Sequence, residues 1–338
     1  MKVRQIVFTE KNKAELLTKE FDLKEDQVCV QTMFSTISPG TERANIIGDL
    51  HVNASKPAEA EAKFPRTVGY SSAGVVAAVG EDVSGIEIGD RVVVFWGKHK
   101  DYNMVTANQV VKIEDDRVSF EEAAISFIAT FPLAAIRKTK LEVGESLMVM
   151  GLGLLGQLAV QLARAAGAVP VIAVDPVKER REAALKYGAD YALDPFAEDF
   201  VQTVKALTGG GVNTAIEVTG AGAGLEECLD CMAKFGRIAL LGCTRDRNFT
   251  IDYYRKVHFP GITIVGAHTN ARPMQESHAG YFTHQDDIKA VLKLCANKRI
   301  DLKCMTGEFY SPEECGDVFE RLINDRNFPT VVQFDWRR

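Results

Sequence analysis

From residue 145 the chain alternates between short apolar runs and longer segments in which apolar residues recur every three to four positions. The apolar runs ESLMVM and VPVIAVD flank the segment LLGQLAVQLARAAGA, and VKERREAALKYGA follows them. The first long segment is predicted to be a helix with one apolar face. Strands that are apolar on both sides are typical of a parallel sheet covered on both faces. This order predicts a β-α-β-α unit.

Three further apolar runs extend this pattern toward the C-terminus: TAIEVTG at 214–220, RIALLGC at 237–243 and ITIVGAH at 262–268. Helical segments separate the earlier runs. The sequence therefore predicts an α/β fold in which a six-stranded, doubly wound parallel sheet of the Rossmann type binds a nucleotide.

The two ends of the chain have a different texture. Residues 1 to about 125 consist of short strand-like runs separated by breaks that contain Gly, Pro and Asp, which predicts a small β-rich domain. After residue 268 come a polar, aromatic segment, two helical patterns and a last strand, TVVQFDW. We expect two domains: a catalytic domain of residues 1–126 completed by 269–338, and a dinucleotide-binding domain of residues 127–268.

Composition narrows the class of protein. The chain has 338 residues, 46% of them hydrophobic and 25% charged, with a net charge of −6 and no basic stripe, so we expect no nucleic-acid partner. No apolar run approaches the roughly 18 to 20 residues of a membrane helix, which favours the cytoplasm and no membrane partner. The seven cysteines do not form a disulfide pattern, and Cys228 and Cys231 are expected to pack within a helix rather than bind metal.

The motif GLGLLG, residues 151–156, stands between the first predicted strand and helix. Gly151 allows the tight turn, Gly153 lets the backbone approach a pyrophosphate, and Gly156 permits close packing of helix against strand. The helix then begins at Leu154 and Leu155, where its N-terminus faces the anion. A glycine-rich turn without a ligand is the alternative for this motif alone.

Asp175 strengthens the nucleotide interpretation. It ends the second strand nineteen positions after Gly156, close to the roughly 20 expected for the acid that binds the ribose hydroxyls. Because an acid there repels a 2′-phosphate, we expect NAD(H) to be preferred over NADP(H). Arg180 is a candidate for stacking over the adenine, although a solvated arginine at the start of a helix is an equal alternative.

The whole chain resembles the medium-chain dehydrogenase/reductase superfamily, whose zinc-type alcohol dehydrogenases are its best-known members. The resemblance is carried by VGYSSAGVVAAVG, VSGIEIGDRVVV, EEAAISFIATFPLAAIRK, VMGLGLLGQLAVQLARAAGA, AIEVTG, IALLGC and ITIVGAH. It implies a GroES-like domain and a Rossmann domain, with cofactor and substrate in the cleft between them. It also implies a homodimer joined edge to edge through the last Rossmann strand.

The resemblance departs from the zinc pattern at each metal position. Zinc members carry Cys-Gly-Thr/Ser-Asp where this chain has Pro39-Gly40-Thr41-Glu42, and Gly-His-Glu where it has Gly69-Tyr70-Ser71. The third ligand position falls on Ser126 or Phe127, and the four-cysteine lobe is absent. We therefore expect no metal, and a likeness to a zinc-free subgroup that includes bacteriochlorophyllide hydroxyethyl dehydrogenases.

Without zinc, other groups must stabilise the charge on the substrate oxygen. Thr41 matches the family's hydroxyl that passes the substrate proton to solvent, Tyr70 replaces the ligand histidine and could act as an acid, and Glu42 could orient Thr41. The alternatives are that Tyr70 only fills the space of the metal and that Glu42 forms a structural salt bridge. Lys98 and His99 could also reach the cleft, although a loop histidine is more often solvated.

Other residues are assigned to the cofactor or the substrate. In relatives the residue matching Thr130 packs near the nicotinamide, and three residues stand at strand ends that face the cofactor in such a sheet: Thr219, Gly242 and Gly266. A substrate contact from His268 or His284 is a further hypothesis.

The leading functional hypothesis is an NAD(H)-dependent, zinc-independent oxidoreductase that interconverts an alcohol, with sugars and polyols among the candidates, and a ketone or aldehyde. One alternative is the reduction of a quinone or an activated C=C bond. Another is a dinucleotide-binding protein that has lost catalysis. The sequence leaves the substrate, the reaction direction and the oligomeric state open.

Overall fold

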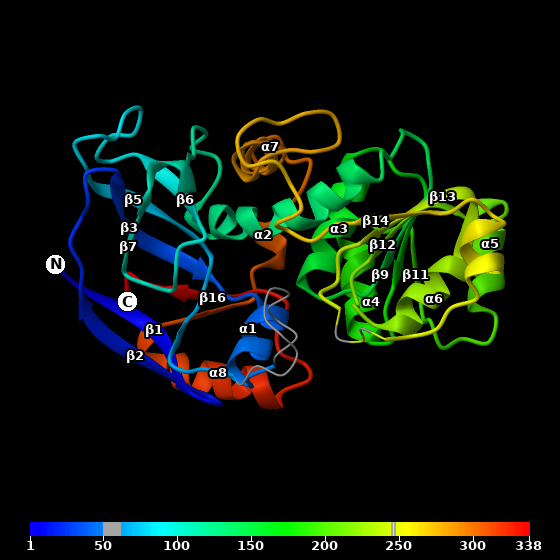
Figure 1. Cartoon of the computed structure of the whole chain (residues 1–338), viewed down its shortest axis with the longest axis horizontal. Helices are drawn as coiled ribbons and strands as arrows, with labels where there is room; N and C mark the ends of the chain where they lie inside the picture. The colour runs from blue at the N-terminus through cyan, green and yellow to red at the C-terminus, as the bar shows by residue number, and fades with distance from the viewer. Residues whose placement is uncertain (50–61, 245, 247) are drawn as a thin grey trace. The chain divides into compact units, whose positions relative to one another are not determined.

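A computed structural model describes residues 1–49, 62–244, 246 and 248–338. Contacts divide the chain into two compact units, Met1–Ile128 with Ile288–Arg338 (unit 1) and Ala129–Asp287 (unit 2). The division falls within two helices, α2 (Phe120–Lys138) and α7 (His284–Ala296). Figure 1 shows both units, labelled by element.

Unit 1 is the β-rich part. It contains a three-stranded sheet in the order β2-β1-β4 and a seven-stranded sheet in the order β15-β16-β3-β5-β6-β8, to which β7 adds by pairing with β3. The strands are β1 (Lys2–Glu10), β2 (Lys13–Glu20), β3 (Gln27–Thr36), β4 (Arg66–Thr67), β5 (Ser71–Val79), β6 (Arg91–Phe95), β7 (Tyr102–Thr106), β8 (Val110–Lys112), β15 (Glu308–Tyr310) and β16 (Val332–Asp335).

The C-terminal strand completes unit 1. β16 pairs antiparallel with β3, so the end of the chain lies beside residues 34–36. Two helices, α1 (Pro39–Ile46) and α8 (Cys315–Asn324), pack against one another, and α8 also covers β2, as Figure 1 shows. A core of fully buried side chains joins these elements, with Phe8, Phe319 and Phe334 among the largest. Unit 1 therefore depends on both ends of the chain.

Unit 2 contains a six-stranded parallel sheet in the order β11-β10-β9-β12-β13-β14. The strands are β9 (Leu147–Met150), β10 (Val171–Val174), β11 (Tyr191–Leu193), β12 (Val212–Glu217), β13 (Met232–Leu240) and β14 (Thr263–Gly266), and the helices are α3 (Leu154–Ala165), α4 (Lys178–Lys186), α5 (Phe200–Thr208) and α6 (Gly222–Cys231). The predicted α/β fold is confirmed. The strand β11 was not recognised in the sequence because only three residues form it.

The strand order reverses at β9. The chain moves outward from β9 through β10 to β11 and then returns to β12 on the other side of β9. Because parallel crossovers are right-handed, α3 and α4 must lie on one face of the sheet and α6 on the other. The predicted apolar face of α3 is buried at Leu158, Ala159 and Leu162. Such a reversal leaves a crevice at the carboxyl ends of the strands, where nucleotides bind.

The segment 269–287 groups with unit 2, whereas the sequence analysis assigned it to the catalytic domain. Arg272 explains the difference. Its guanidinium is almost fully buried, lies 3.0 Å from a carboxylate oxygen of Asp287 and donates to the carbonyl oxygen of Thr130 at 3.2 Å. Lys138 donates to the carbonyl oxygens of Gly266 and Ala271. These contacts tie the segment to the C-terminal half of α2.

Candidate active site

The loop at residues 37–49 folds into a turn followed by α1. Ser38 is the residue before the helix, and Pro39 occupies its first turn, where a missing N–H costs nothing. The carboxylate of Glu42 turns back and accepts the backbone N–H of Ser38 at 2.9 Å. Glu42 is thereby buried, with 1% of its surface exposed. A carboxylate at the start of a helix is favoured by the helix dipole.

His99 provides the second partner of Glu42. Its Nε2 lies 3.0 Å from Oε2 of Glu42, and its Nδ1 lies 2.7 Å from Oγ of Ser35. The backbone N–H of His99 donates to Val68, and its carbonyl oxygen accepts from Ile6, so the main chain is fixed on both sides. The expectation that this loop histidine is solvated is wrong, because its side chain is fully buried.

Gly69 is required by the position of His99. Its φ is +87°, and a Cβ atom at this position would lie 2.6 Å from the backbone nitrogen of His99 and 2.7 Å from its ring. The next residue, Tyr70, therefore belongs to the same stretch of chain that packs against His99. The backbone N–H of Trp96 donates to the carbonyl oxygen of Tyr70 at 2.9 Å.

The phenol of Tyr70 lies among the groups of the loop. Burial of the hydroxyl raises the pKa of Tyr70, the hydroxyls of Ser38 and Thr41 form hydrogen bonds that lower it, and the charge of Glu42 raises it. Burial is the largest effect, so the phenol is held in its protonated form. The structure thus brings Thr41, Tyr70 and Glu42 together, as the sequence analysis expected of the catalytic candidates.

Two aromatic rings surround Tyr70. The ring of Trp96 lies 5.7 Å from it and the ring of Phe127 lies 5.9 Å away in an edge-to-face arrangement. Trp96 has a φ of +57°, which is rare for a bulky residue and is maintained only where the surroundings impose it. Tyr70 and Trp96 are each partly exposed, so this aromatic group offers a surface to a bound molecule.

Lys98 supplies a positive charge to the same region. Its burial lowers the pKa of the ammonium group, and the charge of Glu42 opposes this shift. Lys98 and His99 are therefore both neighbours of Glu42, although the sequence left open whether either reached the site. No spacing signal identified them, because the contacts join residues 57 positions apart.

Few zinc donors gather among the described residues of unit 1. Among the described residues no group of three or more His, Cys, Asp or Glu side chains is arranged to hold a metal ion. Glu42 and His99 are bonded to one another, and Ser126 donates to the carbonyl oxygen of Ala123 at 2.6 Å. Phe127, the other residue at the third ligand position, carries no donor atom. A zinc site needs four suitable ligands, or three and an open position.

The cofactor candidates of unit 2 form the turn between β9 and α3. Gly151 has a φ of +97°, and a Cβ atom on Gly156 would lie 1.9 Å from the carbonyl oxygen of Gly151. Around Gly153, by contrast, a Cβ atom would meet nothing within 4 Å. Gly153 precedes α3 without a side-chain cap, so the first N–H groups of the helix, at Leu154 and Leu155, have no partner within it. This cradle fits a pyrophosphate.

Asp175 follows β10, as predicted, and its carboxylate braces the same turn. One oxygen accepts the backbone N–H of Leu152 and the other that of Val177, each at 2.8 Å. Arg180 lies 3.5 Å from the first oxygen. The side chain of Asp175 is only 4% exposed. Its two hydrogen bonds to backbone N–H groups give it a structural function.

Three of the remaining cofactor candidates, Thr219, Gly242 and Gly266, lie at the carboxyl ends of strands of the sheet. Register pairs Met150 with Glu217, Glu217 with Leu240, and Leu240 with Gly266, so the ends of β9, β12, β13 and β14 are adjacent. Thr219 is exposed there, and a Cβ atom on Gly242 would lie 2.4 Å from the nitrogen of Gly220. Thr130, in contrast, is fully buried in α2.

Glu217 was missed by the sequence analysis. Its buried carboxylate accepts the backbone N–H of Thr219 at 2.7 Å and that of Gly220 at 3.1 Å, and it also accepts the Thr219 hydroxyl. Burial raises the pKa of Glu217, and these hydrogen bonds lower it. An acid at the end of an apolar run, directly before Val-Thr-Gly, was the available signal.

The histidines of the polar segment differ in environment. His268 is exposed and accepts the backbone N–H of Asn270 at 3.2 Å. His284 is buried, and burial together with the charge of Arg272 lowers the pKa of His284 to about 3. Nothing in their surroundings within unit 2 marks either one as a substrate ligand.

Other features of the chain lie away from these groups. Cys228 and Cys231 are buried in α6, as expected, and burial raises the pKa of both thiols.

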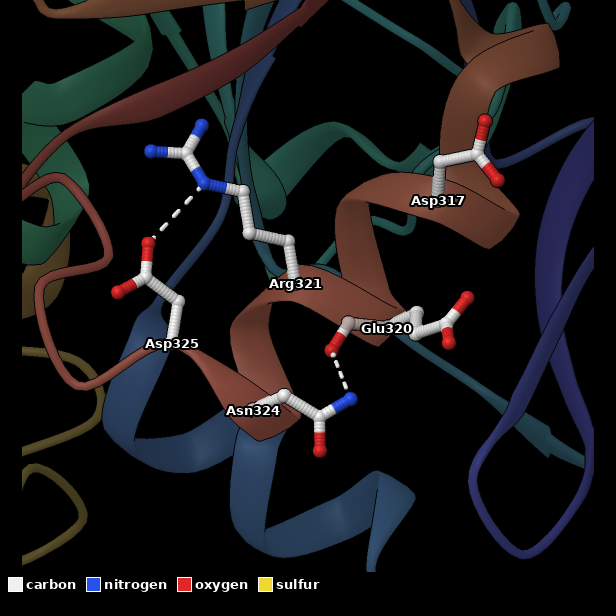
Figure 2. Close-up of a pocket in the computed structure, with 5 residues that line it drawn as sticks. All are labelled: Asp317, Glu320, Arg321, Asn324 and Asp325. Carbon is white, nitrogen blue, oxygen red and sulfur yellow. Dashed lines mark hydrogen bonds and ion pairs between the residues drawn. The ribbon is translucent and has the colours of Figure 1, made fainter.

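A depression of about 400 Å³ lies on α8, and Figure 2 shows its polar lining of Asp317, Glu320, Arg321, Asn324 and Asp325. In this lining the guanidinium of Arg321 already forms an ion pair with the carboxylate of Asp325. Within the described residues no helix is both long and apolar enough to cross a membrane.

Two family models match the chain. Residues 25–115 match the alcohol dehydrogenase GroES-like domain, and residues 155–296 match the model described as zinc-binding dehydrogenase. The GroES-like match covers most of the β-rich part of unit 1 and includes Thr41, Glu42, Tyr70 and His99. The second match covers the dinucleotide turn from Leu155 onward.

Similar proteins are dehydrogenases. The L-threonine 3-dehydrogenase of Pyrococcus horikoshii is 33% identical in an alignment of length 247 that covers 64% of this chain and 71% of that protein. The sorbitol dehydrogenase of Bacillus subtilis is 27% identical over 78% of this chain and 79% of its own length. The crystal structure of benzyl alcohol dehydrogenase from Acinetobacter calcoaceticus matches with a TM-score of 0.83 at 21% identity, covering 99% of both chains.

Proposed function

Because this chain belongs to the medium-chain dehydrogenase/reductase superfamily and is an oxidoreductase, we propose that it interconverts an alcohol and a ketone or aldehyde with NAD(H) and without zinc. The observation that carries the proposal is the cluster of hydroxyl groups at Tyr70, Thr41 and Ser38 beside the buried carboxylate of Glu42. We also propose that the chain belongs to the zinc-free subgroup.

The cluster supplies hydrogen bonds where charge develops. A nicotinamide, when bound, accepts a hydride from an alcohol carbon or donates one to a carbonyl carbon. Tyr70 and Thr41 donate hydrogen bonds to the substrate oxygen. During reduction Tyr70 gives its proton to that oxygen and the phenolate is then reprotonated from solvent, and oxidation reverses both proton transfers. Glu42 favours the protonated phenol between turnovers, because a negative charge nearby opposes ionisation of Tyr70.

Zinc independence rests on the donor set of unit 1. The family description of zinc binding favours the opposite view, but that model matches residues 155–296 and leaves out the positions aligned with the metal ligands. Elemental analysis of protein purified without chelator tests the proposal. We expect well under one zinc per chain and full activity after dialysis against a chelator, whereas stoichiometric zinc needed for turnover would overturn it.

The preference for NAD(H) rests on Asp175. Its carboxylate follows the end of β10, and an acid at this place in a Rossmann sheet would accept from ribose hydroxyls and repel a 2′-phosphate. Arg180 stays a candidate for the adenine, and its pairing with Asp175 keeps it beside that site. Thr130, Thr219, Gly242 and Gly266 remain proposed nicotinamide neighbours.

The substrate class is best sought among polar alcohols. Relatives are named for threonine and sorbitol, and the hydroxyl-rich cluster suits a polyol or sugar carbon that bears an oxygen. A turnover screen with NAD⁺ and NADP⁺ should cover sugars, polyols, hydroxy amino acids and aromatic alcohols, and NADH should be tested with ketones, quinones and enones. Activity on secondary alcohols supports the proposal. Turnover confined to quinones or enones favours the reductase alternative, and tight NADH binding without any turnover favours a non-catalytic protein.

We further propose a homodimer formed through β14. This strand ends the six-stranded sheet, and Ile264 on it is 37% exposed. Two phenylalanines nearby in unit 2, Phe235 and Phe259, are 78% and 71% exposed. An edge strand flanked by exposed aromatic rings is a natural site for pairing with a second sheet.

A further inference from the structure

A chain of hydrogen bonds reaches Glu42 from the C-terminal end of the protein. The indole Nε1 of Trp336 donates to Oγ of Ser35 at 2.9 Å, Ser35 contacts Nδ1 of His99 at 2.7 Å, and Nε2 of His99 contacts Glu42 at 3.0 Å. Apart from Trp336, which is 6% exposed, these side chains show no more than about 2% of their surface. Water therefore cannot take the place of any member.

The donor atoms fix the direction of these hydrogen bonds. An indole nitrogen can only donate, so Oγ of Ser35 accepts from Trp336 and has its own hydrogen available for His99. On the other side of the ring, Nε2 lies 3.0 Å from a carboxylate oxygen of Glu42. If Nε2 carried no hydrogen, two acceptors would face one another without a donor, so Nε2 carries a hydrogen. When Ser35 donates to Nδ1, the neutral ring with its hydrogen on Nε2 satisfies every contact.

The surroundings of the ring also fix its orientation. The main chain of His99 is fixed by Val68 and Ile6, and the ring of Phe334 lies 5.4 Å away in an edge-to-face contact.

We propose that His99 is a positioning residue of the reaction: Trp336 and Ser35 hold its neutral ring with the Nε2 hydrogen directed at Glu42, and Glu42 thereby remains the carboxylate that keeps Tyr70 a hydrogen-bond donor. The inference rests on the proposed function, since it assigns the electrostatic support of the same cluster. Every proton stays on the atom named here during the hydride step, apart from the one that Tyr70 exchanges with the substrate oxygen.

A spectroscopic test requires no substrate. In ¹⁵N-histidine-labelled protein at neutral pH, the side chain of His99 should show a protonated Nε2 and an unprotonated Nδ1, and its signals are assigned by their absence in His99→Gln. In Ser35→Ala the signature should change, because Nδ1 loses its donor. An Nδ1-protonated neutral ring or an imidazolium in the wild-type protein would overturn the inference.

Kinetics then separate positioning from packing. His99→Gln can place an amide N–H near Glu42, whereas His99→Asn reaches only toward Ser35. We expect His99→Asn to lower kcat on the order of 10-fold or more, the range typical of groups that orient a reacting side chain, with KM and NADH affinity little changed. His99→Gln should recover most of this loss. Equal kcat values in the two variants at matched folded fractions would contradict the inference.

A matched control distinguishes the hydrogen bonds that lead from Trp336 to Glu42 from ordinary buried hydrogen bonds. Ser126→Ala removes a buried hydroxyl of unit 1 that donates only to a carbonyl oxygen, Ala123, so it should change stability but not the signature of His99. Trp336→Phe keeps an aromatic side chain, although a smaller one, and removes the N–H, and it should alter the signature. If the signature is as expected but Tyr70→Phe is fully active, the catalytic role proposed for Tyr70 fails, and with it the positioning role of His99, while the tautomer of His99 stands.

Discussion

The carboxylate of Asp175 accepts the backbone N–H of Leu152, 2.8 Å away, and so links the end of β10 to the turn that precedes α3. The second oxygen of the carboxylate accepts the N–H of Val177. One side chain thus holds together the two loops that we propose contact the dinucleotide. The residue proposed to choose between cofactors also shapes the cofactor site.

We predict that Asp175→Ser narrows the preference for NADH over NADPH and weakens the binding of NADH. The variant no longer has the carboxylate that repels the 2′-phosphate of NADPH. Two buried N–H groups also lose their acceptor, which should lower the free energy of unfolding by roughly 1–3 kcal/mol. Isothermal titration calorimetry with both cofactors provides the measurement.

Asp190→Ser is the control for Asp175. Asp190 accepts the N–H of Val171 at 2.7 Å, at the opposite end of β10, so its loss should affect stability and leave the cofactor preference unchanged. Equal affinities of the wild-type protein for NADH and NADPH would reject the assignment of Asp175.

The hydroxyl cluster leads to a prediction about turnover. Tyr70→Phe and Thr41→Val should each lower kcat by about 10²-fold, the typical effect of removing one hydrogen-bond donor from developing charge, while NADH affinity stays near the wild-type value. A phenylalanine still packs against Trp96 and Phe127, so the fold should be retained. Near-normal turnover of Tyr70→Phe on the true substrate would show that the ring only fills space.

His284 and Asp287 lead to a prediction about pH. Burial lowers the pKa of His284 from its usual 6.5 to about 3, so as the pH falls below 6.5 the unfolded chain takes up a proton that the folded chain does not, and stability decreases. Burial raises the pKa of Asp287 from 3.8 to about 6, so between these values the folded chain binds the extra proton as pH falls, and stability increases. The two effects oppose one another between about pH 6 and 4.

In His284→Gln only the contribution of Asp287 should remain. Relative to wild type, the variant should gain stability as the pH is lowered from 6.5, by up to about 1.4 kcal/mol per pH unit. Urea unfolding at pH 7.5, 6.0 and 5.0 measures this change. His278→Gln is the control because His278 is exposed. A constant difference between His284→Gln and wild type across this range would contradict the prediction.

The proposed dimer gives a prediction about mass. Ile264→Arg combined with Phe235→Asp should shift the protein from dimer to monomer, because charges at an edge strand oppose pairing with a second copy. Phe196→Asp is the control, since Phe196 is 79% exposed and follows β11 at the other edge of the sheet. Light scattering at micromolar concentration reports the result. A wild-type monomer under these conditions would exclude the dimer.

The sequence by itself determined the Rossmann sheet and its cofactor turn. Apolar runs at 145–150 and 169–175, the glycines of 151–156 and Asp175 lie close together in the chain, so local spacing carries their geometry. Gly156 shows why: its closeness to Gly151 is set by a turn of six residues. The resemblance also indicated Thr41, Glu42 and Tyr70, each within one short motif.

Only the tertiary structure decided what surrounds Glu42. Ser35, His99 and Trp336 are separated by 64 and 237 positions, and they meet because β16 pairs with β3 and because His99 is fixed between Val68 and Ile6. The placement of 269–287 followed in the same way from Arg272 and Asp287, buried partners 15 positions apart. Buried polar groups must satisfy one another wherever the fold brings them, and this requirement leaves no periodic signal in the sequence.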